Sequence, residues 1–154
     1  MFKKYLATFL LSMVPIIELR GAVILGAGFG LDPWADLIVC IIGSFLPVPF
    51  ILLFIRKILE WMKMRPRFRK IAEKLEKRAE KNRTKVMRFA GFGLFLFVAI
   101  PLPGTGAWTG ALVAALMNMR MKYALPAIFF GVVAAGIIMT LASTGVVSFL
   151  SFLL

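Results

Sequence analysis

Two charged side chains lie within the first apolar stretch of the chain, and they are its best candidates for chemistry. Glu18 and Arg20 stand between Pro15 and Gly21, in a segment that has no other charge from Tyr5 to its end. A charge at mid-membrane costs roughly 2.5 to 3.5 kcal/mol on insertion scales, so such residues face a cavity or a partner. A carboxylate can take up and release a proton, and a guanidinium can bind two phosphate oxygens. The alternative is a structural or interfacial ion pair.

A second candidate site is the segment Pro101-Leu102-Pro103-Gly104-Thr105-Gly106. Its prolines interrupt a helix, and irregular backbone survives in a membrane only where protein or water satisfies it. We expect Gly104 to Gly106 to begin a new half-helix, whose free N–H groups form an anion site. Thr105 either caps this helix or contacts a ligand, and Trp108 either stacks on a ligand or packs. The predicted substrate or proton-binding residues are therefore Glu18, Arg20, Gly104, Thr105, Gly106 and Trp108, and the predicted break residues are Pro15, Gly21, Pro101 and Pro103.

The residue types exclude most catalytic chemistry. The chain has no histidine and one cysteine, and that cysteine, Cys40, lies in an apolar run where packing is its usual role. Histidine-dependent acid–base catalysis and the common zinc sites are thereby excluded. We expect no enzyme activity, no cofactor and no metal.

The elements that must position these residues are membrane helices. Hydrophobic residues make up 61% of the 154 residues, and no charge occurs between Asp36 and Arg56, between Arg88 and Arg120, or after Lys122. Runs of this length are long enough to cross a bilayer. The net charge of +12 does not indicate nucleic acid, because most of the Lys and Arg residues fall in 56–88. We expect this segment to be cytoplasmic and the protein to be in the inner membrane.

The pattern predicts an all-α membrane protein of one domain, 1–154, with two inverted repeats. Each repeat has an apolar arm, a Pro/Gly break, an arm rich in small residues and a long span. In the first repeat these are expected at 5–17, 15–21, 21–31 and 35–55, and in the second at 89–100, 101–106, 107–119 and 123–150. The domain boundaries are 5–57 for repeat one, 58–88 for a basic helix and 89–154 for repeat two. An N-terminal signal peptide is a weaker interpretation, because Glu18 and Arg20 interrupt the stretch where cleavage would occur.

The charges after each hairpin suggest that the second repeat is inverted. Asp32 and Asp36 follow the first hairpin, whereas Arg120 and Lys122 follow the second. If both hairpins are re-entrant, most basic residues lie inside. Four complete crossings are the alternative arrangement, and charge counting does not separate the two. We favour re-entrance because each arm is too short to span ~30 Å at ~1.5 Å per residue.

The basic segment between the repeats predicts an amphipathic helix over 65–86. Apolar residues recur there every three or four positions, at Phe68, Ile71, Ala72, Leu75 and Ala79. Such a helix lies on the inner leaflet or serves as a solvated linker. Small residues also recur at four-residue spacing elsewhere in the chain, which predicts close helix contacts. These residues are Gly26, Gly30, Gly106, Gly110, Ala127, Gly131 and Ala135.

Two motifs resemble those of a known family. They are Pro15-Ile16-Ile17-Glu18-Leu19-Arg20-Gly21-Ala22 and Ile100-Pro101-Leu102-Pro103-Gly104-Thr105-Gly106-Ala107-Trp108-Thr109-Gly110. The chain resembles the putative small multidrug export protein family over nearly its whole length. That family is in turn similar to the DedA membrane proteins, which implies two opposed re-entrant hairpins and translocation of polyprenyl phosphate carriers.

The resemblance implies roles for the charged pair and also shows a departure. Glu18 would be the proton-coupling acid and Arg20 would supply charge to the substrate. DedA proteins place arginines around the second break, whereas this chain has Ala99 and Thr105 there and no charge from Phe89 to Met119. Backbone amides at Gly104 to Gly106 are our hypothesis for replacing that charge.

Three functions follow from these features. The first is proton-coupled translocation of a lipid-linked phosphate such as undecaprenyl phosphate. The second is efflux of organic cations, for which Glu18 and Trp108 would suffice although Arg20 would repel a cation. The third is a non-transporting membrane scaffold. Membrane lipids and further copies of the chain are the expected partners, because a monomer of this size encloses little cavity.

Overall fold

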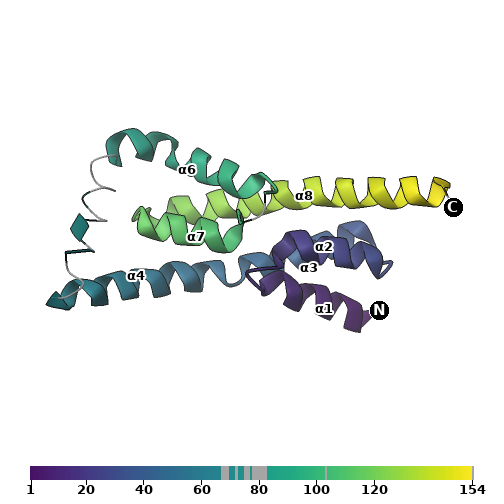
Figure 1. The fold of residues 1–154 in the computed structure, drawn as a ribbon, viewed down its shortest axis with the longest axis horizontal. Coiled ribbons are helices and arrows are strands. Elements are labelled where there is room, and N and C mark those ends of the chain that lie inside the picture. The colour runs from purple at the N-terminus through teal and green to yellow at the C-terminus, as the bar shows by residue number, and fades with distance from the viewer. Residues whose placement is uncertain (67–69, 72, 75–76, 78–82, 103, 154) are drawn as a thin grey trace.

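The computed structural model describes residues 1–66, 70–71, 73–74, 77, 83–102 and 104–153. Within this part the protein is all-helical and contains no strand, as the composition predicts (Figure 1). The helices are α1 (Phe2–Met13), α2 (Glu18–Gly28), α3 (Pro33–Phe45), α4 (Val48–Met64), α6 (Arg83–Ala99), α7 (Ala107–Leu116) and α8 (Met121–Leu153).

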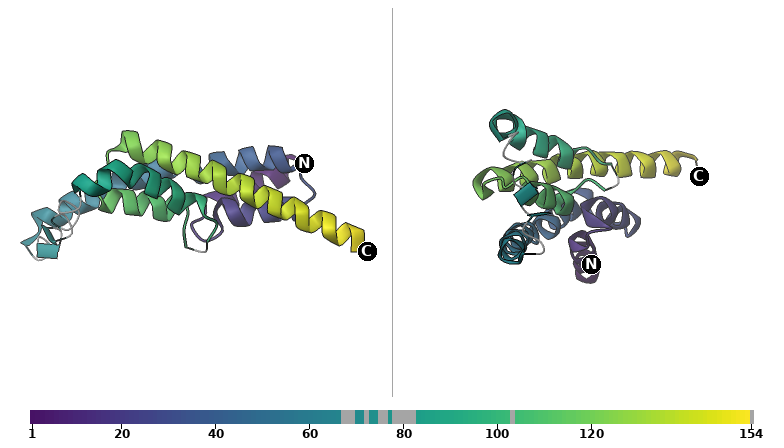
Figure 2. Two further views of the ribbon diagram at one scale, coloured as in Figure 1. Left: turned by 90° about the horizontal axis from the view of Figure 1, so that it is seen from above. Right: turned by 60° about the vertical axis from the view of Figure 1, so that its left-hand side comes forward.

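Two helical hairpins meet tip to tip near the middle of the long axis. One hairpin is α1 with α2 and the other is α6 with α7, and they approach the middle from opposite ends of the molecule (Figure 1). The α3–α4 pair and α8 run alongside and bind both hairpins together, and two further views show α8 extending along most of the molecule (Figure 2). The breaks predicted near residues 15 and 101 are the two hairpin tips.

Two long apolar helical stretches have the length to cross a membrane. They are Pro33–Ile58 and Met121–Gly145 among the described residues, close to the predicted spans. The first contains a turn at Leu46 and Pro47, between α3 and α4. Large apolar side chains such as those of Ile38, Phe54 and Phe130 point outward, which suits a lipid environment and would be costly in water.

Asp32 and Pro33 define the start of α3. The Asp32 carboxylate accepts a hydrogen bond of 2.8 Å from the Ala35 N–H, and Pro33 occupies the first helical position. Asp36, which the charge pattern grouped with Asp32 after the first hairpin, has a different environment. Its side chain faces inward and the residue is only 2% exposed, because it lies one turn into the helix on the side that packs on α1 and α2.

The short helices α2 and α7 end in the same way. Leu31 N–H bonds to Gly26 O at 3.1 Å, and Met119 N–H bonds to Ala114 O at 2.9 Å. In each case the preceding residue is left-handed, with φ of 68° at Gly30 and 52° at Asn118. This is the Schellman arrangement, in which the left-handed residue lets the chain satisfy the last helical carbonyls. Asn118 therefore ends α7.

Small residues let the helices of the second half pack closely. A methyl group added at Gly131 on α8 would lie 2.7 Å from Val98 Cβ and 3.0 Å from Phe95 O, both on α6. One added at Gly110 on α7 would lie 2.6 Å from a Val98 methyl carbon. The close contacts predicted from small-residue spacing are confirmed at these two glycines. Gly30, in contrast, has open space around it.

The basic segment between the hairpins is only partly described. Ile71 is helical, whereas Phe68, Ala72, Leu75 and Ala79 of the predicted amphipathic face lie outside the described residues. Helix α6 begins at Arg83 and continues to Ala99. One helix thus runs through the boundary predicted at residue 88.

Candidate functional site: two helix breaks joined by Glu18 and Arg20

The first break places Glu18 and Arg20 in the opening turn of α2. The chain leaves α1 after Met13, turns through Pro15, and re-enters a helix at Glu18, whose φ is 49°. A left-handed conformation costs a residue with a side chain on the order of 1 kcal/mol. Glu18 adopts this left-handed conformation where the first break ends and α2 begins.

Gly21 does not belong to the first break, contrary to the prediction. It lies inside α2, where an added methyl group would lie 2.6 Å from a methyl carbon of Ile17. Its physical role is therefore to leave room for the side chain that precedes the helix. Pro15, in the turn, agrees with the prediction.

Arg20 binds the end of α6 at the second break. Its guanidinium donates to the carbonyls of Leu102 at 2.8 Å, Ile100 at 3.1 Å and Val98 at 3.2 Å. The last carbonyls of a helix have no partner within that helix, and they form its negative end. A positively charged planar donor is well matched to such a group of carbonyls.

The carboxylate of Glu18 lies at the other side of the same break, at the start of α7. The Trp108 N–H donates to Glu18 Oε1 at 3.2 Å, and a methyl group added at Gly106 would overlap with Oε2. An anion is favourable at a helix N-terminus. The anion position that the sequence predicts at Gly104 to Gly106 is thus filled by the chain's own carboxylate.

Thr105 and Trp108 have partners of their own within this site. The Thr105 hydroxyl donates to Ile100 O at 2.8 Å or Leu102 O at 2.9 Å and accepts from Arg20 at 3.1 Å. It closes the turn at the break and does not cap α7, whose first residue is Ala107. The Trp108 indole N–H donates to Met13 O, at the end of α1, at 3.1 Å. Both side chains therefore join the two breaks.

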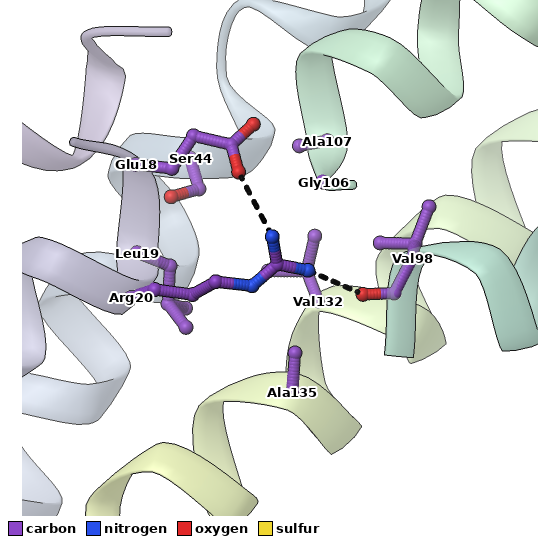
Figure 3. Close-up of a pocket in the computed structure, with 9 residues that line it drawn as sticks. All are labelled: Glu18, Leu19, Arg20, Ser44, Val98, Gly106, Ala107, Val132 and Ala135. Atoms are coloured by element: carbon purple, nitrogen blue, oxygen red, sulfur yellow. Dashed lines mark hydrogen bonds and ion pairs between the residues drawn. The ribbon is translucent and has the colours of Figure 1, made fainter. Parts of the chain in front are cut away.

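Glu18 and Arg20 also face each other across a small gap. Glu18 Oε2 lies 3.9 Å from an Arg20 guanidinium nitrogen, and the two side chains are 12% and 16% exposed (Figure 3). They line two hollows. One is a cavity of about 10 Å³ shared with Ser44, and the other is a pocket of about 530 Å³ that also includes Ile24 and Thr105.

Three residues of this region were missed by the sequence analysis. Arg56 on α4 donates to Met119 O, next to the end of α7, so α7 has Glu18 at its start and Arg56 at its finish. Asp36 and Ser44 are buried in the same face of α3 as Cys40. Asp36, Cys40 and Ser44 recur every four residues within an apolar span, and this spacing was a signal that could have revealed a shared polar face.

Two further points concern the prolines of the second break and metal ligands. Pro103 lies outside the described residues, although Pro101 stands in the irregular segment as predicted. Among the residues that the structure describes, no group of three metal-ligating side chains comes together.

The fold and the site define an all-α membrane protein in which two helix breaks are joined by a charged pair of low exposure. The chain belongs to the putative small multi-drug export protein family, whose model matches residues 18–138. This range begins at Glu18 and includes both sides of the second break. The family prediction is confirmed, and an export family suggests a small membrane transport protein rather than an enzyme. No curated protein and no solved structure shows a significant match to the chain.

Proposed function

We propose that the protein is a proton-coupled transporter in which Glu18 and Arg20 bind the polar end of an amphiphilic substrate. The observation that carries this proposal is the pocket of about 530 Å³ beside the pair. Ligand pockets in proteins commonly have volumes of this order. Glu18, Arg20 and Thr105 line it together with apolar residues, which are Pro15, Ile16, Ile17, Ile24 and Leu25. A charged headgroup and an apolar chain would each find matching surface.

We further propose that the molecule consists of two inverted repeats with re-entrant hairpins. The shared Schellman ends of α2 and α7 support this proposal, as do the opposite directions of the two hairpins in Figure 1. Contacts within each half also correspond. Gly43 packs against Phe9 O and Ser12, and Gly131 packs against Phe95 O and Val98. In this arrangement the segment 56–88 faces the cytoplasm of a cell whose inner membrane holds the protein.

A lipid-linked phosphate, such as undecaprenyl phosphate, is the first candidate substrate. Glu18 presents a carboxylate to the N–H group of Trp108 and to Arg20. If Glu18 takes up a proton, both donors lose their anionic partner, and a phosphate oxygen can take its place. Proton and phosphate would then bind together, so that a proton gradient would drive the phosphate across in the same direction.

An organic cation is the second candidate substrate, in keeping with the family's description. Arg20 is held by three carbonyls and the Thr105 hydroxyl, so its charge is partly offset and it is fixed in place. Glu18 would then be the group that binds either the cation or a proton. Since the two would compete for one carboxylate, cation and proton would move in opposite directions.

Reconstitution into liposomes tests these proposals. Flipping of a polyprenyl phosphate and efflux of a quaternary ammonium cation would be measured at imposed pH gradients of both signs. We expect the gradient to accelerate one of the two substrates, in the same direction as protons for the phosphate or in the opposite direction for the cation. Glu18→Gln should abolish the coupling, whereas Glu60→Gln, at an exposed position on α4, should preserve it. Transport of neither substrate by the wild type, with intact fold, would favour a scaffold and contradict the proposal.

Arg20→Ala does not distinguish the two substrates. From the sequence alone, Arg20→Ala would be predicted to impair anion transport and to spare cation efflux. In the structure, however, Arg20 also braces the second break through the carbonyls of Val98, Ile100 and Leu102. Its removal is expected to disturb either transport process. The direction of coupling is therefore the sharper criterion.

We also propose that the working form is a homodimer or a larger oligomer embedded in lipid. Helix α6 carries Gly91 and Gly93 with open space beside them, which would allow a neighbouring helix to approach closely. Mass measurement of the protein in lipid nanodiscs tests this point. A strictly monomeric particle that transports would contradict it.

A further inference from the structure

A line of buried polar side chains follows α1 and α3 toward the Glu18 site. Asp36, Cys40 and Ser44 follow one another at four-residue spacing on one face of α3. Thr8 and Ser12 do the same on α1, which packs against α3. All five are 0–2% exposed. Burying polar groups in an apolar setting is costly unless they are hydrogen-bonded, and here the hydroxyls of Thr8, Ser12 and Ser44 each donate to a backbone carbonyl.

The line ends at the cavity beside Glu18. Ser44 Oγ donates to Ser12 O at 3.0 Å, and Ser44 lines the cavity of about 10 Å³ that Glu18 and Arg20 also line (Figure 3). A space of roughly this size is close to what one water molecule requires. Ser44 thus belongs both to this line and to the cavity that Glu18 lines.

Asp36 is the group at the far end of the line, and it lacks a well-formed hydrogen bond. Neither of its carboxyl oxygens has such a partner among the described residues, although Thr8 and Cys40 lie beside it. The Thr8 hydroxyl donates to Tyr5 O at 3.0 Å, so its oxygen is left to accept. Gly26 closes the remaining side, since an added methyl group would overlap with Oδ2.

The ionisable groups on the neighbouring helices are directed elsewhere. On α1, Lys3 is exposed and the Lys4 ammonium donates to Phe29 O. On α2, Glu18 and Arg20 contact the second break. On α8, Lys122 lies over the ring of Tyr123. Cys40 is therefore the ionisable neighbour placed beside Asp36.

The corresponding line in the second half is apolar. The matching contacts of Gly43 and Gly131 align Ser12 with Val98, and continuing this alignment pairs Thr8 with Leu94. The shared ends of α2 and α7 align Asp36, Cys40 and Ser44 with Ala124, Ile128 and Val132, all on α8 and all buried. The same packing is thus built from apolar residues in one half and polar residues in the other. Packing alone does not demand the polar line.

We propose that this line is a proton pathway in which Asp36 takes up the proton and Glu18 receives it. Each hydroxyl or thiol along the line accepts one proton and releases another, and a water molecule in the small cavity would complete the path to Glu18. Asp36 changes from carboxylic acid to carboxylate as Glu18 changes from carboxylate to carboxylic acid, so charge is conserved. This inference rests on the proposed proton-coupled transport and names its second ionisable residue.

Infrared difference spectroscopy tests the uptake step without any substrate. The purified protein in lipid nanodiscs would be titrated with acid, and the carbonyl band of a protonated carboxylic acid would be followed. We expect Asp36→Asn to remove one titrating band and Asp32→Asn, at an exposed cap on the same helix, to leave that band unchanged. Because Asn is close to Asp in size, the variant keeps the packing against Gly26. An unchanged spectrum for Asp36→Asn would overturn the proposal.

Coupling in liposomes tests the pathway itself. Ser44→Val and Ser12→Val introduce the residues found at the matching positions of the second half. We expect these variants and Asp36→Asn to retain downhill movement of the transported substrate and to lose acceleration by a pH gradient, with folding checked by melting temperature. Full coupling in all three variants would refute the pathway. If the wild type transports neither substrate, the proposed function fails, and the infrared titration still decides whether Asp36 binds a proton.

Discussion

The two hairpin tips contribute unlike groups to the same site. The first tip supplies charged side chains, Glu18 and Arg20, whereas the second supplies mainly backbone groups, which are the carbonyls at the end of α6 and the N–H at the start of α7. Each charge faces the helix end of opposite sign. A membrane protein can thus hold two charges at a helix break without a complete set of charged partners, because the interrupted helix provides complementary dipoles.

The second break needs no charged residue of its own, because side chains from the first tip satisfy its backbone groups. Interrupting a helix in a membrane leaves carbonyl and N–H groups without partners, and each such group costs several kcal/mol if it stays unsatisfied. Arg20 satisfies three carbonyls and Glu18 satisfies an N–H group. One arginine from the opposite hairpin thus serves the second break, which has no charge from Phe89 to Met119.

Removing Arg20 should break this arrangement most severely. Arg20→Ala removes a charged donor from three carbonyls and the positive charge beside the Glu18 carboxylate, and we expect a loss of about 3–5 kcal/mol in the free energy of unfolding. Arg20→Lys, which keeps the charge without the planar fork, should recover part of it. Denaturant titration in mixed micelles measures the loss. Arg120→Ala, at an exposed position, is the control, and an equal effect of both variants would contradict the bracing role.

Filling the space at Gly106 should separate the tips from each other. An added methyl group overlaps with the Glu18 carboxylate, so Gly106→Ala is expected to cost about 1–3 kcal/mol. Gly93→Ala, which has open space inside α6, should be neutral or stabilising because alanine favours helix. The same titration compares them. A smaller cost at Gly106 than at Gly93 would show that Glu18 does not lie against α7.

Neutralising Glu18 should have a moderate effect on stability and a large one on coupling. Glu18→Gln keeps an acceptor for the Trp108 N–H and loses the charge, so we expect about 1 kcal/mol of destabilisation. A double-mutant cycle with Arg20→Lys should then yield a coupling energy between the two positions. Strict additivity of the two substitutions would indicate that the pair at 3.9 Å contributes nothing.

Exchanging the cap residues tests how closely the two halves correspond, and its effect should be the smallest. Asn118→Gly gives α7 the residue that ends α2, and at a left-handed position glycine should change stability by no more than about 0.5 kcal/mol. Asn118→Ala should be the more destabilising change, because alanine has no such tolerance. Thermal unfolding of both variants measures the difference. Equal stability would argue against the left-handed conformation at this residue.

The sequence predicted the helical layout well because its signals are local. Proline and glycine clusters interrupt helices, Asp32 and Pro33 start one, and long apolar runs define spans, so both tips and both spans were found. Gly21 was misassigned because a glycine that makes room inside a helix looks the same as one that breaks it. Charge counting grouped Asp36 with Asp32, since a count along the chain ignores which face of a helix a residue occupies.

The contacts of the site were beyond local reasoning. Glu18 and Trp108 are 90 positions apart, and the sequence suggested a ligand for each of them without showing that they bind one another. Likewise the spacing of Asp36, Cys40 and Ser44 indicates a common face, but only the packing of α1 against α3 reveals that this face is buried and leads to Glu18.

The depth of the joined tips in the bilayer is the most direct test of the account. The chain has three tryptophans, and Trp34→Phe with Trp61→Phe leaves only Trp108, whose N–H groups bind Glu18 and Met13. Its fluorescence would be measured in lipids brominated at different positions along the acyl chain, beside a variant that keeps only Trp34 at the start of α3. We predict strongest quenching of Trp108 by deep bromines and of Trp34 by shallow ones. Strongest quenching of Trp108 by shallow bromines would place the tips among the headgroups and contradict a transport site within the membrane.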